Sequence, residues 1–242
     1  MEMKMEDHVE LIRDLVIANR ILAREGVVDA FGHVSIRHPD NPERYLMSCS
    51  RAPELVTAAD IMDFTLDGEP VDARDRQPYG ERPIHGGIYE MRPEVNSVVH
   101  NHAHEILPFG ITDTPMRPVA HVCAPIGADI PVWDIRDNFG ETDHLVLTME
   151  QGRDLANTMG DNRVALMRGH GGVVSGGDVR ESVMIAVYLQ VNAKLLLQCL
   201  QLGAPNYLTP TEIEQCTARQ FNPLSLDRAW DYWCARAGGD SL

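Results

Sequence analysis

The chain has 242 residues, of which 44% are hydrophobic and 24% are charged, which is an ordinary composition for a soluble protein. Its formal net charge of -15 argues against nucleic acid or an anionic membrane surface as a partner, because both are bound through clustered Lys and Arg. The charge does not exclude an anionic small substrate, since a few arginines in a cleft can outweigh the overall sign locally.

Location and redox state follow from two further features of the sequence. No run of eighteen apolar residues is present, and residues 1–7 lack the charged-then-apolar form of a secretion signal. We therefore expect a cytoplasmic protein. The cysteines are odd in number and widely spaced, without a Cys-x-x-Cys pair, which favours reduced thiols over disulfides or a zinc ribbon. They are Cys49, Cys123, Cys199, Cys216 and Cys234.

The first part of the chain predicts a helix followed by three extended segments. Apolar residues recur at helical spacing over residues 6–25, and Gly26 ends the stripe. Short runs rich in β-branched and aromatic residues then alternate with Pro, Asp, Asn and Gly, which favour turns. We expect strands at 33–37, 44–48 and 61–66, with the first two forming a hairpin.

The rest of the chain alternates helical and extended patterns. We expect helices at 83–91, at 148–159 and from 178 to 202, and strands at 97–103 and 163–167.

A segment rich in proline and glycine and an aromatic tail are harder to assign. Residues 119–132 look extended, but their prolines and glycine predict a broken or edge strand. The aromatic tail, with Trp230, Tyr232 and Trp233, is expected to pack against a specific surface. No linker or repeat divides the chain, so we expect one α/β domain over residues 1–242, with helices covering a mainly antiparallel sheet.

Two histidines separated by one residue are the most informative feature of the sequence. Side chains two apart on a strand share a face, so His100 and His102 can both reach a single ion. A third histidine, His170, lies in a glycine-rich turn, where the backbone can approach a ligand closely. Any one of the ten histidines could instead be an ordinary surface or core residue. Two others are weaker candidates for metal ligands: His104 and His121.

Three neutral imidazoles predict a catalytic metal site. They suit a divalent ion such as zinc or manganese, with iron or cobalt as further possibilities, and they leave coordination positions open for a substrate. This is how a catalytic metal site is built, rather than a structural one.

Several motifs in the same order resemble the class II aldolase and adducin family. They are Gly32-His33-Val34-Ser35, Glu81 with His85 and Tyr89, Arg92-Pro93-Glu94, Val98-Val99-His100-Asn101-His102 and Gly169-His170-Gly171. The resemblance covers most of the chain and implies a three-layer α/β/α fold. It also implies a divalent metal on the three histidines, an acid at Glu81, which is a candidate metal ligand as well, and a homotetramer with active sites near subunit interfaces.

The chain departs from the sugar-phosphate members of that family where those members bind phosphate. An imidazole, a guanidinium and a phenol replace small hydroxyls and an amide, at His33, Arg51 and Tyr79. The pattern looks like the decarboxylase branch, which acts on hydroxylated aromatic or pyridine dicarboxylates. Arginine can bind a planar carboxylate through two parallel hydrogen bonds. The candidate substrate-binding residues are His33, Ser48, Ser50, Arg51 and Arg82.

These expectations define a hypothesis for the reaction and two alternatives. A metal-dependent decarboxylase would stabilise the enolate or phenolate left when carbon dioxide departs, with Glu81 as metal ligand or proton donor. The first alternative is a metal-dependent aldolase for an unphosphorylated or acidic substrate. The second is a non-catalytic, adducin-like interaction module, which would not need all four metal-site residues. His85 is expected to be structural, and Tyr79 and Tyr232 are weaker candidates for acids.

Overall fold

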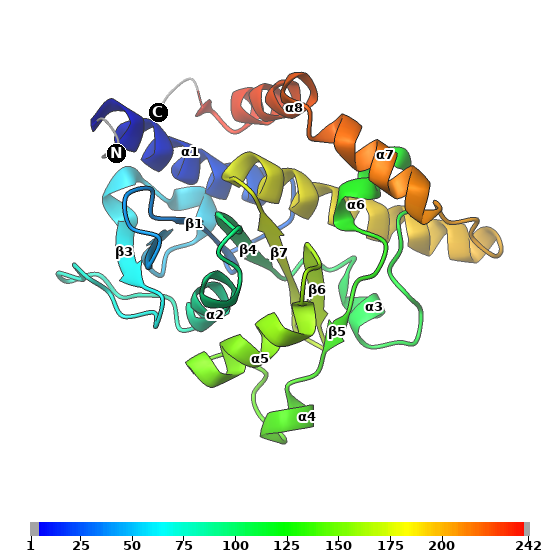
Figure 1. Ribbon diagram of the computed structural model, residues 1–242, viewed down its shortest axis with the longest axis horizontal. Helices are drawn as coiled ribbons and strands as arrows, with labels where there is room; N and C mark the ends of the chain where they lie inside the picture. Colours follow the sequence, from blue (N-terminus) through cyan, green and yellow to red (C-terminus); the bar gives the residue numbers. More distant parts are fainter. Residues whose placement is uncertain (1–4, 240–242) are drawn as a thin grey trace.

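A seven-stranded mixed sheet runs through the structure, a computed structural model that describes residues 5–239 (Figure 1). The strand order is β3-β2-β1-β4-β7-β6-β5. Every neighbouring pair is antiparallel except β5 and β6, which confirms the predicted mainly antiparallel sheet. The strands are β1 (His33–Arg37), β2 (Arg44–Ser48), β3 (Ile61–Thr65), β4 (Ser97–Asn101), β5 (Val132–Trp133), β6 (Val164–Met167) and β7 (Gly171–Gly176).

Helices cover both faces of this sheet and complete the three layers (Figure 1). Neighbouring residues of a strand point to opposite faces, and accordingly Val98 and Val99 belong to two different hydrophobic clusters. One face packs against α1 (Met5–Arg24), α6 (Val179–Leu202) and α8 (Pro223–Arg236). The other packs against α2 (Pro83–Met91) and α5 (Met149–Met159). The predicted α/β/α fold is confirmed.

Short helices fill the connections between these layers. Three are α-helical: α3 (Leu107–Gly110), α4 (Arg136–Phe139) and α7 (Pro210–Gln220). Three are 3-10 helices: η1 (Pro53–Leu55), η2 (Ala58–Asp60) and η3 (His121–Ile126).

Among the described residues, α6 is the one helix that is long and apolar enough to cross a membrane by length and composition. Its position in the fold explains that composition. Half of its most apolar stretch is buried, and side chains such as Val183, Leu189 and Leu196 lie in the core shared with α1 and α8. Its start is also as predicted, because the Asp178 side chain accepts a hydrogen bond from the backbone N–H of Glu181.

Helices α2 and α5 pack so closely that their contact requires glycine. A Cβ atom on Gly152 would lie 2.1 Å from the carbonyl oxygen of Pro83, and one on Gly87 would lie 2.5 Å from the carbonyl carbon of Gly152. These distances are far below an ordinary contact between non-bonded atoms. The contact fixes the first turn of α2 and, with it, the loop that carries Glu81.

The predicted broken or edge strand at 119–132 is confirmed only at its end, where Val132 lies in the edge strand β5. Residues 121–126 form the 3-10 helix η3, and only Val132 and Trp133 join the sheet. A side chain distant in sequence decides this path, because Asn192 of α6 accepts from the N–H of Val119 and donates to the carbonyl of Arg117. No local pattern could reveal those contacts.

Two other parts of the chain differ from the expectations. The strand β7 was not predicted, because its glycines have low strand propensity. The tail forms α7 and α8; Trp230 and Trp233 are buried, as expected, whereas Tyr232 is 57% exposed. The five cysteines are free thiols. Residues 1–4 and 240–242 lie outside the described residues, so the predictions for the N-terminus and for one domain over 1–242 extend beyond them.

Candidate metal centre

Four side chains from three distant segments converge at one end of the central strands. Glu81 comes from the loop before α2, His100 from β4, His102 from just after β4, and His170 from the turn between β6 and β7. Their ligand atoms all lie within 4.8 Å of one another. The Nε2 atom of His102 lies 2.9 Å from that of His100 and 3.1 Å from that of His170. The Glu81 carboxylate lies 3.6 Å from Nε2 of His100 and 3.5 Å from Nε2 of His170.

Backbone contacts hold the ligands in this arrangement. The Nδ1–H of buried His100 donates to the carbonyl of Gly172 at 3.2 Å, so Nε2 of the neutral ring carries a lone pair. Gly169, with φ of +66°, lets the chain turn before His170. One oxygen of Glu81 accepts a hydrogen bond from the N–H of Val146 at 3.0 Å. A Cβ on Gly171 would lie 2.1 Å from the carbonyl of Asn101, so β7 can approach β4 only with glycine there.

The donor atoms fit a divalent cation. His102 faces two other Nε2 atoms, and a single proton on its own Nε2 cannot satisfy both contacts. Three imidazole nitrogens and one carboxylate are the ligand types that zinc and related ions prefer, and these ions bind such groups at about 2 Å. An ion placed among these atoms replaces unfavourable contacts between lone pairs with bonds.

The ionisation states of these residues also suit an ion. Burial lowers the pKa of His100 and, with the neighbouring histidines, lowers the pKa of His102 to about 3. Burial opposes ionisation of Glu81, but the adjacent His100 and His170 outweigh it and hold the Glu81 pKa well below its usual range. At neutral pH, His100 and His102 are therefore neutral and Glu81 is a carboxylate, which are the forms that bind metal.

A chain of buried hydrogen bonds begins beside the cluster. His33 of β1 pairs across the sheet with His100, and their ring centroids are 5.1 Å apart. Nδ1 of His33 lies 2.6 Å from Nε2 of His85, Nδ1 of His85 lies 2.6 Å from Oγ of Ser35, and that Oγ lies 2.8 Å from the hydroxyl of Tyr89. All four side chains are buried.

The order of protons along this series of hydrogen bonds depends on the Tyr89 hydroxyl, at the end away from the cluster. The backbone N–H of Val98 faces the Tyr89 hydroxyl and favours the order in which Tyr89 gives its own proton to Ser35. Ser35 then donates to His85, and His85 donates to Nδ1 of His33. Burial keeps both rings neutral, since it lowers the His33 pKa well below its ordinary value and the His85 pKa to about 3. In this order His33 carries its proton on Nε2 and is a hydrogen-bond donor.

Sequence reasoning missed the role of this chain. His85 was expected to be structural, Tyr89 was noted only as part of a motif, and Ser35 was given no role. A signal was present, because Ser35 follows His33 by two residues on a strand and Tyr89 follows His85 by four on a helix. Each pair therefore shares a face.

Of the other candidate substrate-binding residues, some lie beside His33 and others are turned away from it. Tyr79 packs on His33 with ring centroids 4.6 Å apart, and it also contacts Ser48 and the backbone of Arg51. The Arg51 side chain is turned to its own loop, where Nε donates to the carbonyl of Leu55 at 2.7 Å and lies 3.5 Å from Asp60.

The remaining candidates make backbone contacts or lie apart from the cluster. Ser50 is exposed, and its N–H donates to Gln77. The Arg82 guanidinium donates to the carbonyls of Gly68 and Tyr79. The weaker metal candidates His104 and His121 are both exposed and lie outside the cluster.

The placement of Arg51 leads to a kinetic prediction. We expect Arg51→Ala to raise KM for a dicarboxylate several-fold, because a mobile exposed guanidinium can turn from Leu55 to a substrate carboxylate. The melting temperature should change little, since an exposed ion pair contributes about 1 kcal/mol or less. Steady-state kinetics and thermal unfolding measure the two effects. Arg74→Ala removes another exposed arginine that pairs with Asp72, and serves as the control. Kinetics equal to wild type would remove Arg51 from the site.

Comparisons with known proteins agree on one family and one fold. A family described as class II aldolase and adducin N-terminal domain matches residues 13–197. The decarboxylase tropJ of Talaromyces stipitatus is 34% identical, covering 92% of each chain. The 3,4-dihydroxyphthalate decarboxylase of a Terrabacter species is 31% identical, covering 91% of this chain and 94% of its own. The structure of L-fuculose 1-phosphate aldolase from Glaciozyma antarctica superposes with a TM-score of 0.79 at 18% identity. The superposition covers 98% of this chain and 94% of that one.

Proposed function

This chain belongs to the class II aldolase and adducin family, and we propose that it is a metal-dependent decarboxylase of a hydroxylated aromatic or pyridine dicarboxylate. Relatives named as decarboxylases and aldolases support a carbon–carbon lyase. The observation that carries the proposal is the convergence of Glu81, His100, His102 and His170 beside the buried donor His33.

The metal ligands and the donor His33 would each stabilise negative charge that the reaction places on the substrate. Decarboxylation leaves an electron pair on the ring, and a divalent ion held by the three histidines and Glu81 supplies a Lewis acid for that charge. The Nε2–H of His33, set by His85 and Ser35, donates to an oxygen of the substrate's carboxylate or ring hydroxyl. Because that proton is fixed before the substrate arrives, little reorganisation is needed in the reaction.

Glu81, a carboxylate at neutral pH, is assigned the transfer of a proton to the ring carbon that loses its carboxyl group: it would take that proton from the substrate's ring hydroxyl and then give it to the carbon. One of its oxygens is anchored by the N–H of Val146, so the other is free to face the substrate. The side chain is only 12% exposed, which keeps bulk water from competing for that proton. Arg51 is assigned the second carboxylate, which stays on the ring.

An aldolase for an unphosphorylated substrate is the second candidate, and the likeness to L-fuculose 1-phosphate aldolase favours it. Retro-aldol cleavage also leaves an electron pair beside an oxygen, so the same ligands serve both reactions. The substitutions at His33 and Arg51 favour a carboxylated substrate and hence the decarboxylase. Zinc or manganese, a homotetramer and a cytoplasmic location remain predictions for this protein.

The test is metal analysis of the purified protein followed by a substrate panel. Ortho-hydroxy aromatic and pyridine dicarboxylates are assayed beside hydroxy-aldol substrates, with carbon dioxide and aldehyde as readouts. We expect carbon dioxide from the dicarboxylates, loss of turnover after chelation, and recovery when zinc or manganese is added. Aldehyde without carbon dioxide would support the aldolase. A protein with neither metal nor turnover would support the interaction module.

A further inference from the structure

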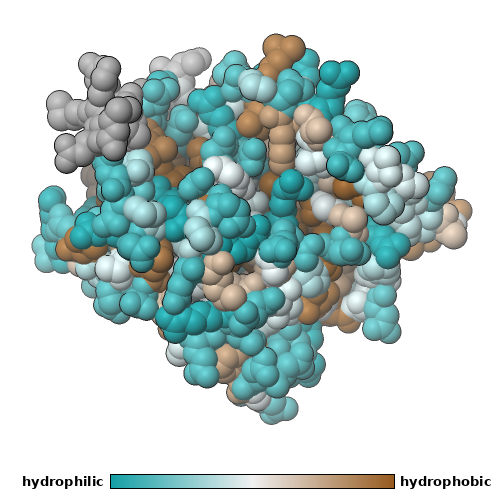
Figure 2. Space-filling view, viewed as in Figure 1, coloured by the Kyte–Doolittle hydropathy of each residue, from teal (hydrophilic) through white to brown (hydrophobic). Residues whose placement is uncertain are grey.

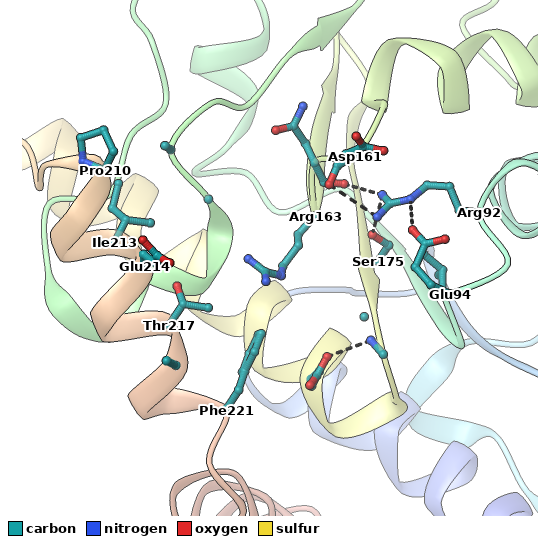
Figure 3. A pocket seen from close by; sticks show the side chains of 18 residues that line it. Arg92, Glu94, Asp161, Arg163, Ser175, Pro210, Ile213, Glu214, Thr217 and Phe221 are labelled. Atoms are coloured by element: carbon teal, nitrogen blue, oxygen red, sulfur yellow. Dashed lines mark hydrogen bonds and ion pairs between the residues drawn. The ribbon is translucent and has the colours of Figure 1, made fainter.

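A cavity of ≈ 720 Å³, drawn in Figure 3, lies at the opposite end of the central strands from the candidate metal centre. Ser175 and Gly176, at the end of β7, line it, whereas Gly171, at the start of β7, follows the ligand His170. Five residues of extended strand separate two points by about 17 Å. The cavity is therefore distinct from the candidate metal centre. Its other wall is α7.

Arg163 projects into this cavity without an acidic partner (Figure 3). Among the described residues, its guanidinium makes no hydrogen bond or ion pair, and its recorded contact is with the ring of Phe221, whose centroid lies 5.2 Å from the guanidinium carbon. Arg163 is partly buried, and this burial lowers the pKa of its guanidinium. Partly buried charged groups are normally paired, so this guanidinium is free to bind an anion.

A second polar group in the same cavity also lacks a partner. The side-chain oxygen of Thr217, on α7, is buried and has no hydrogen-bond partner among the described residues, and Thr217 is only 8% exposed. Buried hydroxyls are nearly always hydrogen-bonded in proteins. Ile213 and Phe221 flank Thr217 on the same wall. The cavity thus offers a guanidinium, a hydroxyl and an apolar surface to one ligand.

The acids around the cavity form no ion pair with Arg163 within the part of the chain that the structure describes. Glu94 pairs with Arg92 and is 64% exposed, and Asp161 and Glu214 are exposed at the rim, where water screens their charge. The Glu181 carboxylate accepts from the N–H of Gly177 at 2.8 Å; its charge acts on Arg163 and raises the Arg163 pKa, but the two side chains make no ion pair. These acids still disfavour multiply charged anions, so a monoanion fits better than a phosphate.

We propose that this cavity is a second ligand site, which binds a small monocarboxylic acid with an apolar body. The carboxylate receives two hydrogen bonds from Arg163 and one from Thr217, and the apolar body packs against Phe221 and Ile213. Bidentate pairing of arginine with a carboxylate supplies orientation as well as affinity. The volume lies within the range of cavities that hold single-ring ligands.

The experiment is calorimetric titration of the metal-loaded protein with benzoate. We expect saturable binding that weakens at least tenfold in Arg163→Gln and severalfold in Thr217→Val, and that persists in His100→Ala, where the metal centre is disrupted. Arg180→Gln removes a partly buried arginine that has acidic partners, Asp14 and Asp227, and should leave benzoate binding unchanged. Benzyl alcohol, which lacks the charge, should bind much more weakly.

Three results would overturn the proposal. They are no saturable binding of benzoate to the wild type, equal binding by Arg163→Gln, and loss of all binding in His100→Ala, which would place benzoate at the metal centre. Thermal unfolding of each variant shows whether it is folded. If Arg163→Gln does not fold, Thr217→Val and Arg163→Lys carry the test, because Lys keeps the charge without the two-pronged geometry. Unchanged affinity in both would then contradict the site.

Discussion

Replacing His100 by alanine is expected to abolish turnover and metal binding together. His100 is completely buried, and its Nε2 faces both His102 and Glu81 while Nδ1 is held by Gly172. Alanine leaves a cavity and two histidine ligands. Since a Lewis acid supplies several kcal/mol of transition-state stabilisation, we expect kcat to fall by about three orders of magnitude or more.

Elemental analysis and steady-state kinetics measure the two losses in the same preparation. His104→Ala is the matched control, because His104 is exposed, lies close in sequence and is outside the cluster. It should keep both metal and activity. Turnover that persists in His100→Ala, or after complete removal of metal, would contradict the proposed mechanism.

Gly152→Ala is expected to lower the stability of the fold strongly. The new methyl group would lie 2.1 Å from the carbonyl oxygen of Pro83, so α2 and α5 would have to move apart. Alanine normally stabilises a helix relative to glycine by about 0.5–1 kcal/mol, so a loss here can come only from the contact. Overpacking of this kind costs about 1–3 kcal/mol or more. The free energy of unfolding should fall by about that amount.

Urea denaturation measures the loss, with Asn157→Ala as the control on the same helix. Asn157 is exposed, so its replacement should leave stability nearly unchanged or slightly higher. Folded Gly152→Ala should also lose activity, because Pro83 follows Glu81 by two residues and the carboxylate would shift with α2. Wild-type stability in Gly152→Ala would show that the two helices can separate without cost.

Much of the fold was readable from the sequence because its signals are local. The spacing of His100 and His102 and the glycines around His170 reflect strand and turn geometry, which adjacent residues determine. The His102 side chain reaches the cluster although the residue lies just beyond the end of β4. In contrast, η3 depends on Asn192, more than seventy residues away, and β7 depends on a close approach to Asn101 that only glycine allows.

The arginines show why substrate-binding residues are harder to predict than metal ligands. An arginine side chain is long and flexible, and its sequence position does not tell which carbonyl or carboxylate it will meet. Arg82 holds the turn at Gly68, and Arg51 holds its own loop. Nothing in the sequence singles out Arg163. Its lack of an acidic partner among the described residues is a property of the folded structure alone.

The metal centre also has a consequence for how the protein unfolds. Its ligands come from the loop before α2, from the end of β4 and from the turn before β7, so an ion bound to all of them ties three segments that are far apart in the chain. Such an ion binds the native state and not the open one, and at a thousand times its dissociation constant it adds about 4 kcal/mol to stability. The lifetime of the folded chain, and its resistance to proteases, would then follow the concentration of free metal around it.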